Sequence, residues 1–217
     1  MDLFPIWLSL RVSLTATALT LVIGIPVAWL LARKRFQGRD LLEALVVFPL
    51  ILPPTVLGYY LLVVIGGAGP VGRALAAAGF ELAFTWRAAV LAASLGSIAL
   101  LIKAAQAGFE TVDIRLEQAA RTLGRSEWSI FWAVTLPLAW RSVLAGTVLA
   151  FCRAMGEFGI TLMVAGSIPG KTQTLPLAIY DHVQANQMRE ANILALIAVG
   201  VVAVLLFGLS RLVRLRY

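Results

Sequence analysis

Cysteine and histidine are almost absent from this sequence of 217 residues, which contains only Cys152 and His182. One cysteine excludes an intrachain disulfide and a thiolate cluster that would hold a metal ion. With one histidine, and no pair of carboxylates placed for acid–base chemistry, the sequence predicts no catalytic residue and no enzymatic activity. We therefore expect no metal ion and no cofactor in this chain.

Charged residues are also scarce, at 13% of the chain, whereas 60% of the residues are hydrophobic and the mean hydropathy is +0.91. A soluble domain needs a polar surface, and this composition leaves little with which to build one. The formal charge of +7 could indicate a nucleic-acid-binding protein. The basic residues gather beside apolar runs rather than forming a stripe, so we expect contact with lipid and none with nucleic acid.

The apolar residues form five stretches, each long enough to cross the hydrocarbon core as a helix of about 20 residues. Helices are expected because each span must satisfy its own backbone hydrogen bonds. The N-terminal residues lack the basic segment and cleavage site of a removable signal peptide. The sequence therefore predicts an all-α membrane protein, with one transmembrane domain over residues 1–217 and spans at about 7–32, 41–65, 88–108, 140–165 and 191–211.

The distribution of basic residues predicts the orientation of these five transmembrane helices. If the first loop, the segment 111–139 and the C-terminus share one side, that side holds twelve Lys and Arg residues: Arg33, Lys34, Arg35, Arg39, Lys103, Arg115, Arg121, Arg125, Arg141, Arg211, Arg214 and Arg216. The other side holds four, which are Arg73, Arg87, Lys171 and Arg189. Because Lys and Arg are in excess on the cytoplasmic side, we expect the N-terminus outside and the C-terminus in the cytoplasm.

A polar segment at about residues 111–139 separates two of the apolar runs and is too charged to lie in a bilayer. Asp113 can cap a first short helix, and Gly124 can adopt the left-handed turn that ends it. Ser126 can cap a second short helix, which we expect Pro137 to end.

Along the first of these helices, Leu116, Ala119, Ala120 and Leu123 recur at the spacing of a single helical face. Two adjacent alanines let another backbone approach closely, while the leucines supply apolar anchors. Arg121 adds a charge that a partner could pair with. The pattern predicts a helix that docks against another protein.

This segment resembles the cytoplasmic EAA loop of bacterial ABC-importer permeases, whose pattern is Glu-Ala-Ala, three residues, Gly, nine residues and Ile-x-Leu-Pro. Ala119, Ala120 and Gly124 match, and Val134 stands in place of isoleucine. Gln118 occupies the glutamate position, with Glu117 one place earlier. The resemblance implies that the loop transmits the motion of an ATPase subunit, through Leu116, Glu117, Gln118, Ala119, Ala120, Arg121, Leu123, Gly124, Leu136 and Pro137.

Two further stretches, residues 49–66 (PLILPPTVLGYYLLVVIG) and 153–180 (RAMGEFGITLMVAGSIPGKTQTLPLAIY), resemble the membrane subunit of molybdate ABC importers. The resemblance implies the type I importer fold, a homodimer, two cytoplasmic ATPase subunits that hold ATP and magnesium, and an extracytoplasmic oxyanion-binding protein. It implies import of molybdate across the cytoplasmic membrane by alternating access. A sulfate or tungstate permease of the same fold is the close alternative, and a stand-alone channel or secondary carrier is the alternative from another class.

Several residues within the spans are candidates for the translocation pathway or its gate. The paired prolines of the second span form either a fixed bend or a bend that lines a polar route. Arg153 and Glu157, the charges deepest in a span, are spaced to pair on one helix face. We favour a structural or gating pair over a binding site, because Glu157 would repel an anionic substrate. The pathway or gate candidates are Pro53, Pro54, Thr55, Ser94, Ser97, Arg153 and Glu157.

The second outer loop contains a partial match to a nucleotide-binding motif and an apolar patch. Gly170, Lys171 and Thr172 match the end of a Walker A phosphate loop, but Ala165 stands where that motif requires glycine. The predicted topology also puts this segment outside the cell, so we reject nucleotide binding here. The apolar residues that follow are expected to lie flat at the membrane surface or to contact a soluble partner: Leu175, Leu177, Ala178 and Tyr180.

Overall fold

The computed structural model describes residues 2–214, and no β-strand occurs among them. The elements in chain order are α1 (Phe4–Arg33), α2 (Arg39–Ile51), α3 (Pro54–Ile65), α4 (Pro70–Ala77), α5 (Trp86–Glu110), α6 (Ile114–Thr122), α7 (Glu127–Ile130), the π-helical turn η1 (Phe131–Thr135), α8 (Leu136–Met155), α9 (Gly159–Ala165), α10 (Leu175–Gln184) and α11 (Met188–Arg214).

Four segments are long and apolar enough to cross a membrane, namely α1, α5, α11 and the continuous run from α7 through η1 to α8. The consecutive helices α2 and α3 form a fifth candidate span, with a bend of 110° between them. The all-α fold is thus confirmed, with four candidate spans, or five if the bent pair counts as one, and the bend falls at Pro53 and Pro54. The run Glu127–Met155 begins well before residue 140, where the fourth span was expected. The orientation of the termini stays a prediction.

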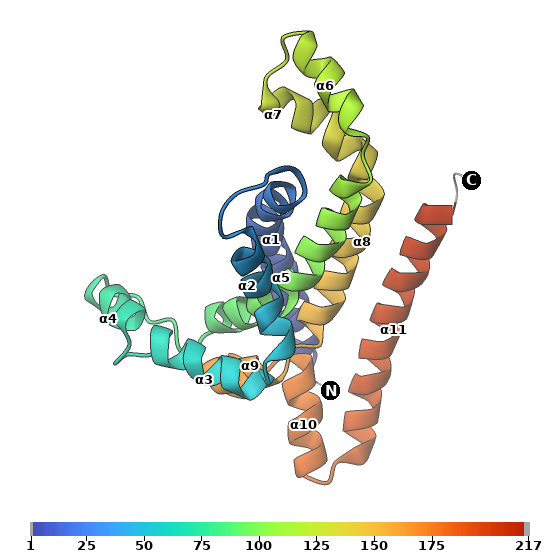
Figure 1. Ribbon diagram of the computed structural model, residues 1–217. Coiled ribbons are helices and arrows are strands. Elements are labelled where there is room, and N and C mark those ends of the chain that lie inside the picture. Colours follow the sequence, from blue (N-terminus) through green and yellow to red (C-terminus); the bar gives the residue numbers. More distant parts are fainter. Residues whose placement is uncertain (1, 215–217) are drawn as a thin grey trace.

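The long helix α5 lies at the centre of the bundle, with α1 and α8 packed along it and α2 against its C-terminal half (Figure 1). Most of its buried positions hold Ala, Ser or Gly, including Ala88, Ala92, Ala99 and Ala105. Small side chains let helices approach closely in lipid, where hydrophobicity itself does not drive helices together. By contrast, α11 stands to one side and leaves most of its surface exposed.

The bend between α2 and α3 touches a second helix break, which lies at residues 156–158 between α8 and α9. Pro54 is the first residue of α3 and Gly159 the first of α9, and a Cβ built on Gly159 would lie 2.7 Å from the Pro54 Cβ. No side chain larger than hydrogen fits there without movement, so the two breaks are in direct contact. The span expected at about residues 140–165 is therefore divided between α8 and α9.

The expectation that Pro137 ends a helix is wrong. The chain passes from α7 through η1 into α8 without interruption, and Pro137 lies in the first turn of α8. A proline ring clashes with the carbonyl four residues earlier in a regular α-helix. The π-helical turn, in which the Leu136 N–H donates to the Phe131 carbonyl, widens the helix just before the proline and lets it continue.

The outer apolar patch was predicted only in part. Leu175, Leu177 and Ala178 are 0–2% exposed and do not lie on a surface. They belong to α10, which packs between the start of α1 and α11, and the Leu175 N–H donates to the Ser9 hydroxyl at 2.6 Å. Only Tyr180, which is 41% exposed and packs against Phe158, remains at the surface.

Candidate functional site

The helices α6 and α7 form a hairpin that projects from one end of the bundle (Figure 1). The Asp113 carboxylate accepts the Arg115 N–H at 2.9 Å and so caps α6. Gly124, with φ of +77°, provides the left-handed turn after α6. Ser126 caps α7 by accepting the Ser129 N–H. The local signals that predicted these boundaries are all confirmed.

The predicted docking face of α6 is open. Leu116 and Leu123 are 48% and 82% exposed, Ala119 is also exposed, and Ala120 is half-buried. Leu116 and Leu123 thus leave apolar surface uncovered beside small side chains, and burial of that surface against a partner would be favourable. The exposed face of α6 is therefore apolar and uncovered in the single chain, as a surface that docks against another protein would be.

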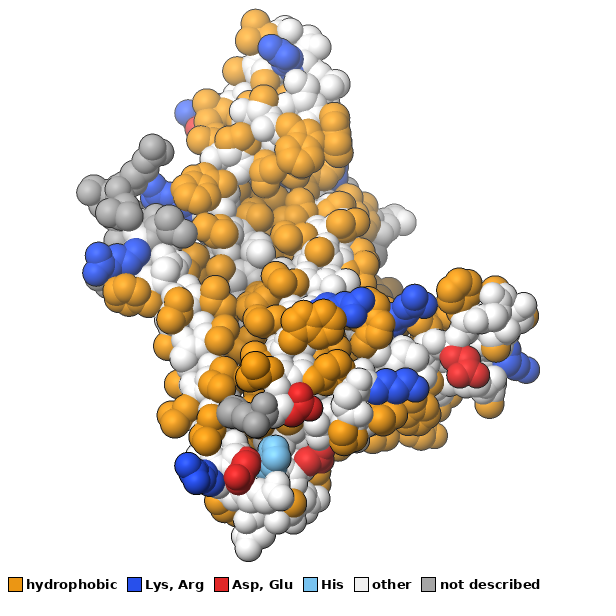
Figure 2. Space-filling model, turned by 180° about the vertical axis from the view of Figure 1, so that it is seen from behind, with side chains coloured by type: hydrophobic (Ala, Val, Ile, Leu, Met, Phe, Trp, Pro, Cys, Tyr) orange, Lys and Arg blue, Asp and Glu red, His pale blue; other side chains and the backbone are white. Residues whose placement is uncertain are grey.

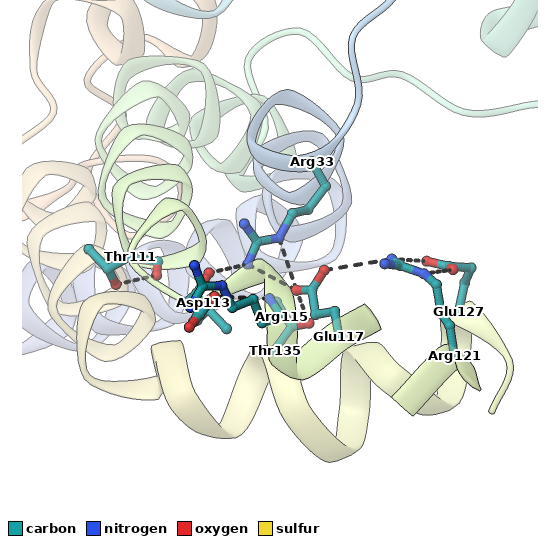
Figure 3. Close-up of polar contacts among 10 residues, drawn as sticks. Arg33, Thr111, Asp113, Arg115, Glu117, Arg121, Glu127 and Thr135 are labelled. Atoms are coloured by element: carbon teal, nitrogen blue, oxygen red, sulfur yellow. Dashed lines mark hydrogen bonds and ion pairs between the residues drawn. The ribbon is translucent and has the colours of Figure 1, made fainter. Parts of the chain in front are cut away.

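On the opposite side of α6, Glu117 is turned into the bundle and is only 1% exposed (Figure 3). Its Oε1 accepts the Arg33 Nε–H at 2.9 Å and the Thr135 hydroxyl at 2.7 Å. Arg121 Nη2 lies 3.7 Å from the other carboxylate oxygen. Because a buried carboxylate is costly unless it is paired and hydrogen-bonded, this set of contacts fixes how α6 sits on the bundle.

Arg33 extends the same network across the end of the bundle. It lies in the last turn of α1, and its Nη2 also donates to the Val112 carbonyl in the α5–α6 connection at 2.9 Å. We call Arg33, Glu117 and Thr135 the Glu117 clamp. The clamp joins α6 to α1 and to η1, which continues into α8.

Sequence reasoning did not identify Arg33 or Thr135 as site residues. Arg33 and Glu117 are 84 residues apart in the chain, and no local pattern relates them. A usable signal was nevertheless present, because Glu117 directly precedes the motif positions and falls outside the apolar face of α6. A charge there needs a partner if that side of the helix is buried.

Arg121 is already engaged within the hairpin and does not project freely toward a partner. Its guanidinium donates to both carboxylate oxygens of Glu127. This bidentate contact between two charged groups raises the pKa of Arg121. The pair ties the end of α6 to the start of α7. Because both side chains are substantially exposed, we expect it to shape the hairpin rather than to stabilise it strongly.

The remaining residues of the predicted coupling set lie in two places. Gln118, at the motif's glutamate position, is exposed on α6. Leu136 packs in the bundle beside Phe131 and Phe109, and Pro137 follows it at the start of α8. Leu136 and Pro137 thus lie at the base of the hairpin, whereas the exposed apolar face is formed by residues of α6.

The predicted pairing of Arg153 and Glu157 is present at the break between α8 and α9. The Arg153 Nη1 lies 2.6 Å from Glu157 Oε2, and Glu157 Oε1 accepts the Ile160 N–H at 2.9 Å. Glu157 is 2% exposed, whereas Arg153 is 33% exposed. The carboxylate thus holds the end of α8 and the start of α9 together, in close contact with Gly96 of α5.

The other pathway candidates differ in exposure. Pro53, Pro54 and Thr55 are exposed at the α2–α3 bend. Ser97 is fully buried and Ser94 is 7% exposed, and their hydroxyls donate to carbonyls of α5 itself. A role for these serines as pathway walls stays a prediction, and it requires a conformation in which α5 is uncovered.

Replacing Glu157 with glutamine is expected to lower the yield of folded protein. The change removes the charge that neutralises Arg153 within a span, where an unpaired charge costs roughly 2.5–3.5 kcal/mol. Size-exclusion chromatography in mild detergent measures the loss, with Glu81→Gln, at an exposed position in the loop between α4 and α5, as the control. A normal yield combined with lost transport would instead favour a direct role in the pathway.

Thr172, one of the residues that match the end of a Walker A motif, has a structural role. The Thr172 hydroxyl donates to the Gly166 carbonyl and accepts the Ile168 N–H, both at 3.1 Å. Thr172 is fully buried, so this hydroxyl closes the loop between α9 and α10. Among residues 2–214, no group of three or more His, Cys, Asp or Glu side chains is placed to hold a metal ion.

Comparison with known proteins gives a consistent result. Residues 24–216 match the family model described as the inner membrane component of binding-protein-dependent transport systems. The chain is 45% identical over 185 residues to the molybdenum transport system permease protein ModB of Haemophilus influenzae, covering 85% of this chain and 81% of the relative. It is 48% identical over 178 residues to ModB of Escherichia coli K12, covering 82% and 78%. A probable sulfate transport system permease of Chlorokybus atmophyticus is 32% identical, covering 93% and 71%.

Two solved structures have a similar fold. The inward-facing methionine ABC transporter MetNI aligns with a TM-score of 0.76 at 19% identity, covering 97% of this chain and 93% of that chain. A bacterial ABC transporter that imports alginate aligns with a TM-score of 0.71 at 16% identity, covering 97% and 79%. At these identities the likeness concerns the fold alone.

Proposed function

The chain belongs to the family of inner membrane components of binding-protein-dependent transport systems, and from that membership we propose that it is the permease of an ATP-driven molybdate importer. Members of this family are multi-pass proteins of the cytoplasmic membrane and are not themselves enzymes. In our proposal, two copies enclose the pathway, two cytoplasmic ATPase subunits hold ATP and magnesium, and an extracytoplasmic oxyanion-binding protein delivers the substrate.

The choice of molybdate rests on one observation, the gap in identity between two groups of relatives. Relatives named for molybdenum transport are 45% and 48% identical over more than four fifths of this chain. The relative named for sulfate transport is 32% identical. Tungstate and sulfate are also tetrahedral dianions, so sulfate or tungstate transport remains the second candidate function.

The α6–α7 hairpin supports an ATPase-coupled mechanism. The apolar face of α6 inserts into the ATPase subunit, and closure of the nucleotide-bound ATPase dimer displaces the helix. The Glu117 clamp passes the displacement to α1 and η1. A ligand or nucleotide shifts such an equilibrium only by its differential affinity for the two states. Shifting the population of two conformations from 1:99 to 99:1 takes about 5.5 kcal/mol of differential binding free energy. Because the Glu117 clamp holds α6 rigidly on the bundle, little of this free energy would be spent on bending α6.

The pathway must shield the substrate from hydrocarbon, in which a bare dianion is prohibitively unfavourable. The touching breaks at the α2–α3 bend and at residues 156–158 are the place where backbone polar groups interrupt the apolar spans. Pro53, Pro54 and Thr55 are exposed on one side of this contact, and Arg153 is partly exposed on the other. We assign the moving part of the pathway to these breaks.

Uptake by reconstituted vesicles tests the function. The chain is incorporated with its ATPase subunits, and the binding protein and labelled molybdate are added outside. We expect uptake that requires ATP and that excess tungstate reduces more than excess sulfate does. Stronger uptake of sulfate than of molybdate would favour the second candidate. Flux without the ATPase subunits would instead indicate a stand-alone channel or secondary carrier.

A further inference from the structure

A long apolar groove runs between α1 and the segment from α7 to α8. Its volume is about 690 Å³, within the range of about 300–1,000 Å³ found for small-molecule sites. The side chains that line it are hydrophobic except for Glu127, which is already paired with Arg121. The groove is therefore suited to a hydrocarbon chain and not to a polar solute.

The length and position of the groove match one leaflet of a bilayer. Its α1 wall runs from Leu21 to Trp29, about 12 Å at 1.5 Å per residue. Half of the hydrocarbon core is about 15 Å thick. Trp29, Trp128 and Trp132 stand at the end toward the hairpin, and tryptophan is enriched at the membrane–water interface. The groove thus begins at the interface and runs toward the midplane, as an acyl chain does.

Basic residues follow at the interfacial end. Lys34 and Arg35 come directly after α1 and are exposed, and Lys34 Nζ lies 5.7 Å from the centre of the Trp29 ring. An acyl chain gains little by leaving the bilayer for an equally apolar groove. Selection among lipids must therefore come from the headgroup, and basic side chains near the cytoplasmic surface attract anionic lipids.

Neither of the two bent helices, α2 and α3, lines the groove. Its walls come from α1, α7, η1 and α8, with no residue from α2 or α3. In Figure 1 α1 lies behind α2, and Figure 2, seen from behind, shows hydrophobic side chains over much of this face. We propose that the groove binds one anionic phospholipid of the cytoplasmic leaflet, with an acyl chain between α1 and α8 and the phosphate beside Lys34 and Arg35.

Lipids with brominated acyl chains quench the fluorescence of tryptophans that they contact. Three of the six tryptophans, Trp29, Trp128 and Trp132, line the groove, so the assay uses a chain in which Trp7, Trp86 and Trp140 are replaced by phenylalanine. The full chain is placed in phosphatidylcholine vesicles that contain a small fraction of either brominated phosphatidylglycerol or brominated phosphatidylcholine. We expect half-maximal quenching at an about thirtyfold lower fraction of the anionic lipid, as two basic side chains at the surface would produce. The assay contains no substrate and no ATP, so its result is independent of the proposed transport function.

Three substitutions locate the site. Lys34→Ala combined with Arg35→Ala should remove the preference for the anionic headgroup. Because both side chains are exposed, their loss should not disturb folding. Val22→Phe should reduce quenching by filling the groove, whereas Leu14→Phe, at an exposed position of α1 outside the groove, should not.

Four outcomes would overturn the proposal. The first is equal quenching by the two lipids in the unaltered chain, and the second is a preference that survives loss of both basic residues. The third is the same effect from Val22→Phe and Leu14→Phe. The fourth is an absence of quenching by either lipid in the complex assembled with the ATPase subunits, which would show that protein covers the groove.

Discussion

Replacing Glu117 with alanine is expected to lower the free energy of unfolding by about 3–5 kcal/mol, the usual effect of removing one partner of a buried ion pair. The substitution leaves the Arg33 guanidinium in a site where its side chain is only 8% exposed. It also removes the acceptor of the Thr135 hydroxyl. Denaturant or thermal unfolding in mild detergent measures the loss.

Gln118→Ala is the matched control, because it shortens an exposed neighbour on the same helix and should change stability by less than about 0.5 kcal/mol. A double variant, Arg33→Met with Glu117→Leu, should lose less than Glu117→Ala does, because no charge is left buried. It should still couple poorly, since the polar contacts between α1 and α6 are gone. If Glu117→Ala proves no more harmful than Gln118→Ala, the clamp does not hold the hairpin.

Replacing Ala119 with aspartate is expected to reduce ATP-driven uptake by about tenfold or more while leaving the chain folded. Ala119 is exposed in the chain, so the change should alter stability by no more than about 0.5 kcal/mol. In the complex it would bury a carboxylate in an apolar contact, and a loss of only 1.4 kcal/mol is a tenfold change in affinity. ATP hydrolysis should then no longer respond to the loaded binding protein.

Thr122→Asp introduces the same charge on the same helix, at an exposed position outside the face formed by Leu116, Ala119, Ala120 and Leu123. It should leave coupling largely intact. Normal stimulation of ATP hydrolysis in the Ala119→Asp complex would show that α6 does not make the contact. A loss of folded protein would show that Ala119 faces the bundle instead.

The sequence was most informative where structure is decided by neighbouring residues. Asp113 and Gly124 delimit α6 because a cap and a left-handed turn need only a few adjacent backbone groups. The apolar runs predicted the spans because a bilayer imposes their length. The i, i+4 spacing of Arg153 and Glu157 predicted their pairing, although Glu157 lies just beyond the end of α8, in the break before α9.

The sequence was least informative where distant segments meet. The contact between Arg33 and Glu117 depends on the packing of α1 against α6, which no local pattern reveals. Leu175 and Leu177 form part of an amphipathic-looking stretch, but the surface they cover belongs to α1 and α11. Pro137 was misread because its local effect is to end a helix, whereas the π-helical turn before it removes the clash.

The contact between Pro54 and Gly159 has a consequence for how the molecule moves. With no room for a methyl group between them, neither broken span can swing toward the other while its neighbour stays still. A push on either broken span is therefore passed directly to the other, whereas a movement of the two spans apart is not resisted by this contact.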